Sequence, residues 1–404
     1  MNAVTKVKKV IQKGIIKNIY RSNNRNQSIW VFGEWFGNRG QDNSMFLANY
    51  IAANKSGIDL YWIANDNADL RGLDSSIRVL QRGSDEAKSI LTICGVAVVS
   101  QSLEDLTPEG LSYVEGAVSI LLWHGIPWKM IGHDGQHTHS LGAKLYARML
   151  DYVNSLSYYA SPSDEFDKVL RTAFNVKKSR IIHSGYPRNS GFYSPRDVAA
   201  KKKELMDEIK AIAPGCNYSK SKVIAYMPTF RNYTHETFSF TKLLENKRFK
   251  AFIENEDIIV IQKSHYVNQT RDGQNKVNSF ERIFNLNNIA AQELLAAADL
   301  LVTDYSGAFF DYTLLDRPIV HYLYDYKRYK EEDRGLYYEK DDVVAGAIAE
   351  NEEELVCEII RNLQEPSLYK ERRAYVRSRF LKYESAESCE LLYQAIIKRQ
   401  KKSM

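Results

Sequence analysis

The segment Leu122–Lys129 (LWHGIPWK) contains the first histidine of this sequence, and its position favours acid–base chemistry. An apolar run, Val118 to Trp123, ends on His124, and a glycine and a proline follow. This pattern predicts a buried strand that ends in a tight turn at the edge of a sheet. Open α/β sheets bind ligands at the carboxyl ends of their parallel strands, and an imidazole there can move protons near neutral pH. His124 is therefore the first catalytic candidate, although a lone histidine is more often structural.

Three further segments place polar or cationic residues directly after an apolar run: Met227–Arg231, Ile261–His265 and Val302–Gly307. A fourth, Asp333–Gly335, lies in a loop after the predicted strand Ile319–Leu323. Ser306 and its neighbours precede a predicted helix, and the N–H groups of a helix N-terminus favour phosphate. Plain N-capping by Ser306 would explain the same residues. Together the five segments are expected to place His, Lys, Arg and Ser/Thr side chains at the carboxyl ends of the strands. This composition favours a phosphoanhydride ligand, because a guanidinium donates two parallel hydrogen bonds to phosphate oxygens.

Other chemistries are disfavoured by residue spacing. His133, His137 and His139 lie close together in a glycine-rich loop, but they match no recognised metal-ligand spacing, so no metal site is predicted. The sequence lacks the glycine motifs of NAD-binding and P-loop proteins. The four cysteines are far apart, which is typical of reduced thiols in a cytosolic protein.

The net charge of +5 is concentrated at the N-terminus, where residues 1–27 hold seven basic side chains and no acidic ones. The remainder has 48 basic against 50 acidic residues, which argues against a nucleic-acid-binding surface. Valines and isoleucines recur at helical spacing from Val4 to Ile19, opposite the lysines. This predicts a basic amphipathic helix on an anionic membrane surface, with a helix packed on the domain, or a frayed terminus, as the alternative. Since no stretch is long enough to span a bilayer, a peripheral protein on the cytoplasmic face of the cell membrane is expected.

Short apolar strands alternate with helical patterns from Ser28 to about Pro187. Strands are predicted at Ile29–Gly33, Ile58–Ala64, Val96–Gln101, Val118–His124, Tyr158–Ser161 and Arg180–Gly185, with helices at 43–55, 85–94, 141–154 and, after a Ser163 cap, 164–173. Such alternation is typical of βαβ units that build a mainly parallel sheet covered on both faces.

The composition changes at residues 191–221, which are polar and include a lysine-rich helix candidate, so a domain junction is expected there. The alternation then resumes, with strands at Val223–Met227, Ile258–Gln262, Leu300–Thr303 and Ile319–Leu323 and helices near 240–255, 290–298 and 307–315. The tail from 352 to 402 is predicted to be helical throughout.

These patterns predict an α/β protein of GT-B architecture, in which two Rossmann-like domains face each other across a cleft and helices follow at the C-terminus. The expected parts are the basic helix at 1–27, an N-terminal domain at 28–195, a linker at 196–221, a C-terminal domain at 222–375 and a helical tail at 376–404. Other two-domain α/β proteins, including periplasmic binding folds, would show a similar pattern.

At this level the chain resembles the CDP-glycerol glycerophosphotransferase family, whose enzymes build the polyol-phosphate chains of teichoic acids and related capsules. The resemblance extends from about Trp30 to Tyr338 and is carried by WHGIPWK at 123–129, GYPRN at 185–189, PTFR at 228–231, TDYS at 303–306, FDY at 310–312, RP at 317–318 and RG at 334–335. Two residues depart from the family pattern: Ser190 stands where an aspartate is usual, and Gly307 where a serine is usual.

The resemblance implies roles for the candidate residues. His124 is expected to be the catalytic base, and His265 a second active-site histidine near the transferred phosphate. The donor, CDP-glycerol, is expected to bind the domain at 222–375 through Thr229, Arg231, Lys263, Thr303, Asp304, Ser306, Gly307 and Arg334. The acceptor, a polyprenyl-linked glycan or polyol phosphate, is expected to bind the other domain through Lys129, Arg188 and Asn189. No further cofactor is expected, and a divalent cation stays open.

The sequence thus predicts a transferase that moves glycerol phosphate from CDP-glycerol to an acceptor hydroxyl and releases CMP. Three alternatives remain: a ribitol-phosphate transferase that uses CDP-ribitol, a GT-B glycosyltransferase that uses a sugar nucleotide, and a non-catalytic nucleotide-binding partner of a polysaccharide assembly complex.

Overall fold

The computed structural model describes residues 25–107, 113–135, 157–214, 217–231, 233–234, 238–263, 279–280, 282–333 and 335–403. Its internal contacts divide the chain into two compact units. Unit 1 contains Met1–His124, Gly132–Ser190 and Lys382–Met404, and unit 2 contains Gly125–Ile131 and Gly191–Leu381. Each unit is therefore built from separate stretches of the chain.

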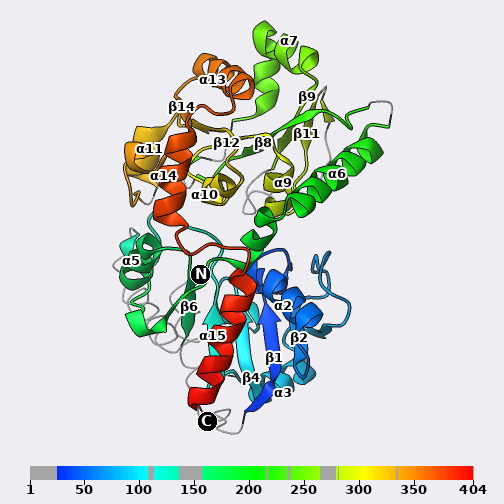
Figure 1. Ribbon diagram of the computed structural model, residues 1–404, viewed down its shortest axis with the longest axis vertical. Helices are drawn as coiled ribbons and strands as arrows, with labels where there is room; N and C mark the ends of the chain where they lie inside the picture. Colours follow the sequence, from blue (N-terminus) through cyan, green and yellow to red (C-terminus); the bar gives the residue numbers. More distant parts are fainter. Residues whose placement is uncertain are drawn as a thin grey trace. The chain divides into compact units, whose positions relative to one another are not determined.

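Unit 1 is a seven-stranded, wholly parallel sheet in the order β3-β2-β1-β4-β5-β6-β7 (Figure 1). Its strands are β1 (Asn26–Gly33), β2 (Asp59–Ala64), β3 (Arg78–Gln81), β4 (Cys94–Val99), β5 (Val118–Leu121), β6 (Tyr158–Ser161) and β7 (Ile181–His183). Its helices include α2 (Asn43–Asn54), α3 (Asp85–Ile93), α5 (Asp164–Ala173) and α15 (Ser388–Ser403). The continuous apolar strands are buried on both faces, as a parallel sheet requires.

Short polar residues start the helices of unit 1. The side chains of Asp42, Ser84 and Ser163 accept hydrogen bonds from backbone N–H groups in the first turns of α2, α3 and α5. At the other end of the chain, Leu392 and Ile396 of α15 enter the same core as Trp30 of β1. The C-terminal helix therefore completes the unit that the N-terminal half begins.

Unit 2 is also a seven-stranded sheet, in the order β10-β11-β9-β8-β12-β13-β14, and only β10 runs antiparallel to its neighbour. Its strands are β8 (Lys222–Met227), β9 (Ile258–Gln262), β10 (Ser279–Phe280), β11 (Ile283–Asn285), β12 (Leu300–Thr303), β13 (Ile319–Tyr322) and β14 (Ala347–Ala349). Its helices are α6 (Pro195–Ile212), α7 (Lys247–Asn255), α9 (Ala291–Ala297), α10 (Ala308–Tyr312), α11 (Tyr326–Glu332), α12 (Lys340–Val343), α13 (Glu352–Gln364) and α14 (Lys370–Phe380). In Figure 1, α6 lies beside α9 and α7 beside α13, in agreement with their contacts.

The parallel α/β class is confirmed, and the elements differ from expectation in detail. Most of the segment expected as a linker, 196–221, is the 18-residue helix α6 of unit 2, because Ser194 caps it and Pro195 occupies its first turn. The tail is not one continuous helix but three, α13, α14 and α15; α13 and α14 lie in unit 2 and α15 in unit 1. The strands β3, β11 and β14 are too short for a periodic signal.

The expected N-terminal helix falls mainly on residues outside the described part, as does the helix expected at 141–154. Arg25, counted with the basic residues of that N-terminal segment, is buried in unit 1. Its guanidinium donates to the carbonyls of Leu91, Cys94, Tyr113 and Glu115. Within the described ranges, no helix has the length and apolar character needed to cross a membrane.

Candidate active site

His124 lies in a strained turn just beyond the carboxyl end of β5. The strand ends at Leu121, three residues earlier than predicted, and Trp123 then adopts a positive φ of 61°. A bulky residue in this region costs about 1–3 kcal/mol, and such strain concentrates at functional sites. The half-buried imidazole contacts two indole rings in tilted arrangements, with centroid distances of 4.3 Å to Trp123 and 5.6 Å to Trp35. These ring faces favour a cation, so they would stabilise the imidazolium formed when His124 takes a proton.

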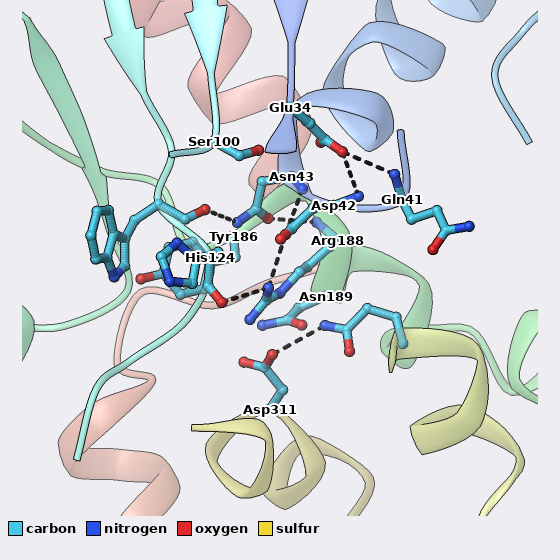
Figure 2. Close-up of polar contacts among 12 residues, drawn as sticks. Glu34, Gln41, Asp42, Asn43, Ser100, His124, Tyr186, Arg188, Asn189 and Asp311 are labelled. Carbon is cyan, nitrogen blue, oxygen red and sulfur yellow. Dashed lines mark hydrogen bonds and ion pairs between the residues drawn. The ribbon is translucent and has the colours of Figure 1, made fainter. Parts of the chain in front are cut away.

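The backbone of this turn is held by side chains from two other elements (Figure 2). The Asn43 amide donates to the Trp123 carbonyl at 2.9 Å, and the Arg188 guanidinium donates to the His124 carbonyl at 2.9 Å. Asn43 begins α2, and Arg188 lies in the short helix Pro187–Tyr193 that follows β7. Arg188 also donates to Asp42 at 2.8 Å. Its side chain is nine-tenths buried, so this expected acceptor-binding residue is packed against the turn that carries His124.

Glu34 supports the same region from the end of β1. Its carboxyl accepts hydrogen bonds from the backbone N–H groups of Gln41, Asp42 and Met45, each at 2.9 Å, and thereby fixes the start of α2 (Figure 2). Burial, aided by the charge of Asp42, raises the pKa of Glu34 to about 8, although the three N–H donors oppose this shift. The sequence analysis did not single out Glu34; the signal was an acidic residue directly after a buried strand.

The segment that carries Arg188 is held in turn by the C-terminal part of unit 1. The Glu384 carboxylate accepts from the backbone N–H of Tyr186 at 2.9 Å and from the Asn189 side chain at 3.2 Å. Gly185 has a φ of +69°, and a Cβ there would lie 2.7–2.9 Å from Glu384 and Ser388. Asn189 is completely buried. The GYPRN segment therefore depends on glycine for its turn and on Glu384 for its anchorage.

In unit 2 the expected donor residue Arg231 is almost completely buried in an ion-paired cluster. It donates to Asp304, to both carboxylate oxygens of Asp325 at 3.0 and 3.1 Å, and to the Thr229 carbonyl at 2.6 Å. The ring of Tyr305 lies 5.2 Å from its guanidinium. Burial disfavours the charged guanidinium, but the two carboxylates outweigh this and raise the pKa of Arg231. The arrangement is that of a structural ion pair.

Two threonines expected at the donor site are also buried. Thr303 donates to the Met227 carbonyl at 2.7 Å, and the backbone N–H of Thr229 donates to Asp304 at 2.8 Å. These contacts join the carboxyl ends of β8 and β12, which are adjacent in the sheet. Thr229, Thr303 and Asp304 therefore shape the strand ends and are covered by protein.

Ser306 and Gly307 are the more accessible part of the TDYSG segment. Both are half-buried, and the Ser306 hydroxyl accepts from the Ala308 N–H at 3.3 Å, while Gly307 rather than Ser306 is the N-cap of α10. A Cβ on Gly307 would lie 2.3 Å from the carbonyl oxygen of Ile126, although the φ of Gly307 is an ordinary −66°. A side chain at this position would therefore force the Ile126 backbone to shift.

The WHGIPWK motif is divided between the two units, because Gly125–Ile131 belongs to unit 2. There Lys129 pairs with Leu336, the Met130 N–H donates to the Gly335 carbonyl at 3.0 Å, and the buried Trp128 indole donates to Tyr338 at 2.8 Å. The motif therefore packs beside the RG segment, whose Arg334 lies outside the described residues, as does His265. Lys263 lies just after β9 and donates to the Asn287 carbonyl at 2.9 Å.

The described residues bring together one group with metal-ligand geometry, Asp164, Asp167 and His183. An ammonium already occupies part of it, since Lys382 lies 2.7 Å from Asp164. The His183 ring N–H donates to the Asp167 carboxylate at 2.8 Å, and the ring stacks on Tyr383 at a centroid distance of 4.1 Å. These contacts account for the group as an anchor of the C-terminal segment. His133 is exposed, and the other two histidines of its cluster lie outside the described residues.

Solved structures establish the class of fold. The wall teichoic acid polymerase TagF superposes on this chain with a TM-score of 0.79, covering 99% of this chain and 97% of that one at 23% sequence identity. The S. aureus MnaA–UDP structure superposes with a TM-score of 0.53 at 11% identity, covering 94% of this chain and 98% of that one. The molecule is therefore a two-sheet α/β protein of the GT-B class, as the sequence predicted.

Sequence comparison gives the family. The model of the CDP-Glycerol:Poly(glycerophosphate) glycerophosphotransferase family matches residues 18–398, and the chain belongs to this family of transferases. A teichoic acid poly(glycerol phosphate) polymerase of Bacillus spizizenii is 28% identical over 344 residues, which cover 82% of this chain and 83% of that protein. A teichoic acid glycerol-phosphate transferase of Staphylococcus aureus is 27% identical over 304 residues, with coverages of 72% and 74%.

Proposed function

We propose that this enzyme transfers glycerol phosphate from CDP-glycerol to a hydroxyl of a lipid-linked teichoic acid acceptor, with His124 as the general base. Membership of the glycerophosphotransferase family supports the donor and the reaction class. The names of the two relatives support glycerol phosphate as the transferred group and teichoic acid as the product. The observation that carries the assignment of the base is the position of His124, half-buried against two indoles in a strained turn at the carboxyl end of β5.

In the proposed step, His124 removes the proton of the acceptor hydroxyl while that oxygen attacks the phosphorus bonded to glycerol. A new phosphodiester bond forms, the bond to the CMP oxygen breaks, and CMP leaves with the electron pair of that bond. Ser306, Gly307 and Lys263 are half-buried rather than enclosed, so they are the described donor residues best placed to meet phosphate oxygens. Arg334 and His265 are proposed for the same charge balance from their sequence positions alone.

CMP release from CDP-glycerol and from CDP-ribitol, each with a lipid-linked acceptor analogue, tests this proposal. The His124→Ala variant is expected to lose about two to four powers of ten in turnover with CDP-glycerol, the usual contribution of a general base. His133→Ala is the matched control, because this exposed histidine lies nine residues further along the same unit. It is expected to keep the turnover of the wild type.

Each alternative has its own outcome in this assay. CMP release from CDP-ribitol alone would show that the enzyme is a ribitol-phosphate transferase. Consumption of a sugar nucleotide instead would indicate a glycosyltransferase. Binding of CDP-glycerol without CMP release with any acceptor would favour a non-catalytic partner. Turnover of His124→Ala within a few-fold of the wild type would remove His124 as the base.

We also infer that residues 1–24 bring the enzyme to an anionic membrane surface, the place of a polyprenyl-linked acceptor. Six lysines and arginines without an acidic residue support this, since each basic residue near such a surface contributes about 1 kcal/mol. Sedimentation with vesicles of phosphatidylglycerol and phosphatidylcholine is expected to carry down the full chain, and much less of a variant with Lys6, Lys9, Lys13 and Lys17 changed to Gln. Equal binding of both proteins would refute the inference.

A further inference from the structure

The chain leaves unit 1 after His124, re-enters it at Gly132, leaves again after Ser190 and returns at Lys382. Within unit 1, one set of buried and half-buried side chains holds the segments next to three of these four points. Arg188 bonds to the carbonyl of His124, Asn189 bonds to Glu384, and both follow Tyr186, whose N–H also bonds to Glu384. We call Glu34, Asp42, Asn43, Arg188 and Glu384 the anchor cluster.

The anchor cluster fixes two successive carbonyls of the turn that carries His124. The Trp123 carbonyl receives the Asn43 amide, and the His124 carbonyl receives the Arg188 guanidinium. Arg188 and Asn43 are also joined to each other, since the Arg188 backbone N–H donates to the Asn43 side chain at 3.1 Å. Because Trp123 has a positive φ, the turn would relax towards an ordinary conformation without such contacts.

We infer that Arg188, supported by Asp42 and Asn43, is a positioning residue that sets the location of the His124 imidazole, rather than a contact for the acceptor. Three observations carry this inference. Arg188 is buried, it donates hydrogen bonds to both Asp42 and the His124 carbonyl, and the turn that it holds is strained at Trp123. Both hydrogen bonds come from one nitrogen, Nη1, which the planar guanidinium holds in a fixed position. A lysine ammonium lies on a shorter, flexible stem and would not occupy that position. This inference rests on the proposed role of His124.

Arg188→Lys is the informative substitution, because it keeps a positive charge beside Asp42 and removes the planar group that places Nη1 between Asp42 and the His124 carbonyl. The misplaced base is expected to lower kcat about 10- to 100-fold, since a displacement of the order of 1 Å costs that much, while KM for CDP-glycerol and acceptor stays within about two-fold. Asn43→Ala removes the bond to the Trp123 carbonyl and the bond from the Arg188 backbone N–H, but it keeps the Arg188–Asp42 ion pair. It is expected to act in the same direction and serves if Arg188→Lys fails to fold.

Arg25→Lys is the matched control. Arg25 is as buried as Arg188 and also donates to carbonyl groups of unit 1. It precedes β1 and bonds at the start of β4, near the amino ends of the strands, whereas His124 follows the carboxyl end of β5. This variant is expected to melt at a lower temperature than the wild type while kcat, measured well below the melting temperature, stays within about two-fold. An equal loss of kcat in both variants would show that stability alone is responsible and would overturn the inference.

A double-mutant cycle with His124→Ala separates positioning from other roles. If Arg188 acts only through His124, Arg188→Lys lowers the residual turnover of His124→Ala by less than about two-fold. If the turnover losses of the two single variants multiply in the double variant, the inference is overturned. A raised KM for the acceptor with unchanged kcat would also overturn it and would indicate that Arg188 binds the acceptor. Wild-type turnover of His124→Ala by itself would instead remove the proposed function, so the two failures are distinguishable.

Discussion

Replacing Arg231 by methionine tests whether this guanidinium holds unit 2 together or contacts the donor. The side chain is 1% exposed and lies between Asp304 and Asp325, which are 3% and 12% exposed. Methionine fills a similar volume but leaves both carboxylates facing each other without their cation. Removing one partner of a buried pair costs about 3–5 kcal/mol. For a domain of about 150–250 residues this corresponds to a melting temperature lower by roughly 6–20 °C.

The assay combines calorimetry with steady-state kinetics at a temperature where the variant is folded. Under those conditions KM for CDP-glycerol is expected to stay within about two-fold of the wild type. Arg328→Met is the matched control, because Arg328 forms an exposed pair with Glu332 in the same unit. Exposed pairs contribute little, so its melting temperature is expected to remain close to that of the wild type.

The opposite pattern would refute this reasoning. If Arg231→Met has the melting temperature of the wild type while KM for CDP-glycerol rises ten-fold or more, Arg231 contacts the donor, as its place in the PTFR motif suggests. A fall in melting temperature together with an unchanged KM would assign Arg231 to the structure of unit 2.

Gly307→Ala is expected to lower both stability and turnover, because its Cβ would lie 2.3 Å from the Ile126 carbonyl oxygen. Calorimetry and CMP release measure the two quantities, and a melting temperature and a turnover equal to those of the wild type would contradict the prediction. Stability, measured by urea titration, should fall as the pH rises from about 5 to 8. The folded Glu34 carboxyl keeps its proton to about pH 8, whereas the unfolded one loses it near its ordinary pKa of 4.5. A Glu34→Gln variant should lack this slope. Maleimide should label the exposed Cys357 first and reach Cys94 only after unfolding, because burial raises the pKa of the Cys94 thiol to about 12; mass spectrometry of labelled peptides decides.

Local patterns were sufficient for the main strands and for the class of fold. The buried strands of parallel sheets are continuous apolar runs, and β6, β8, β9 and β12 were predicted nearly to the residue. The pattern was insufficient where tertiary contacts decide. β14, for example, has three residues and is a strand because it pairs with β13, and the C-terminal tail divides because its last helix completes the core of unit 1.

The sequence alone determined which residue types follow the strands, because strand ends, glycines and histidines are visible in the order of the residues. Only the tertiary structure decided which of these side chains are enclosed. Arg231 was expected among the phosphate-binding residues at the strand ends, but Asp325, 94 positions away, converts it into a buried ion pair. Arg188 was expected to meet the acceptor, but Asp42, 146 positions away, holds it against the His124 turn. The role of a charged group depends on partners from distant parts of the chain, and no local spacing records them.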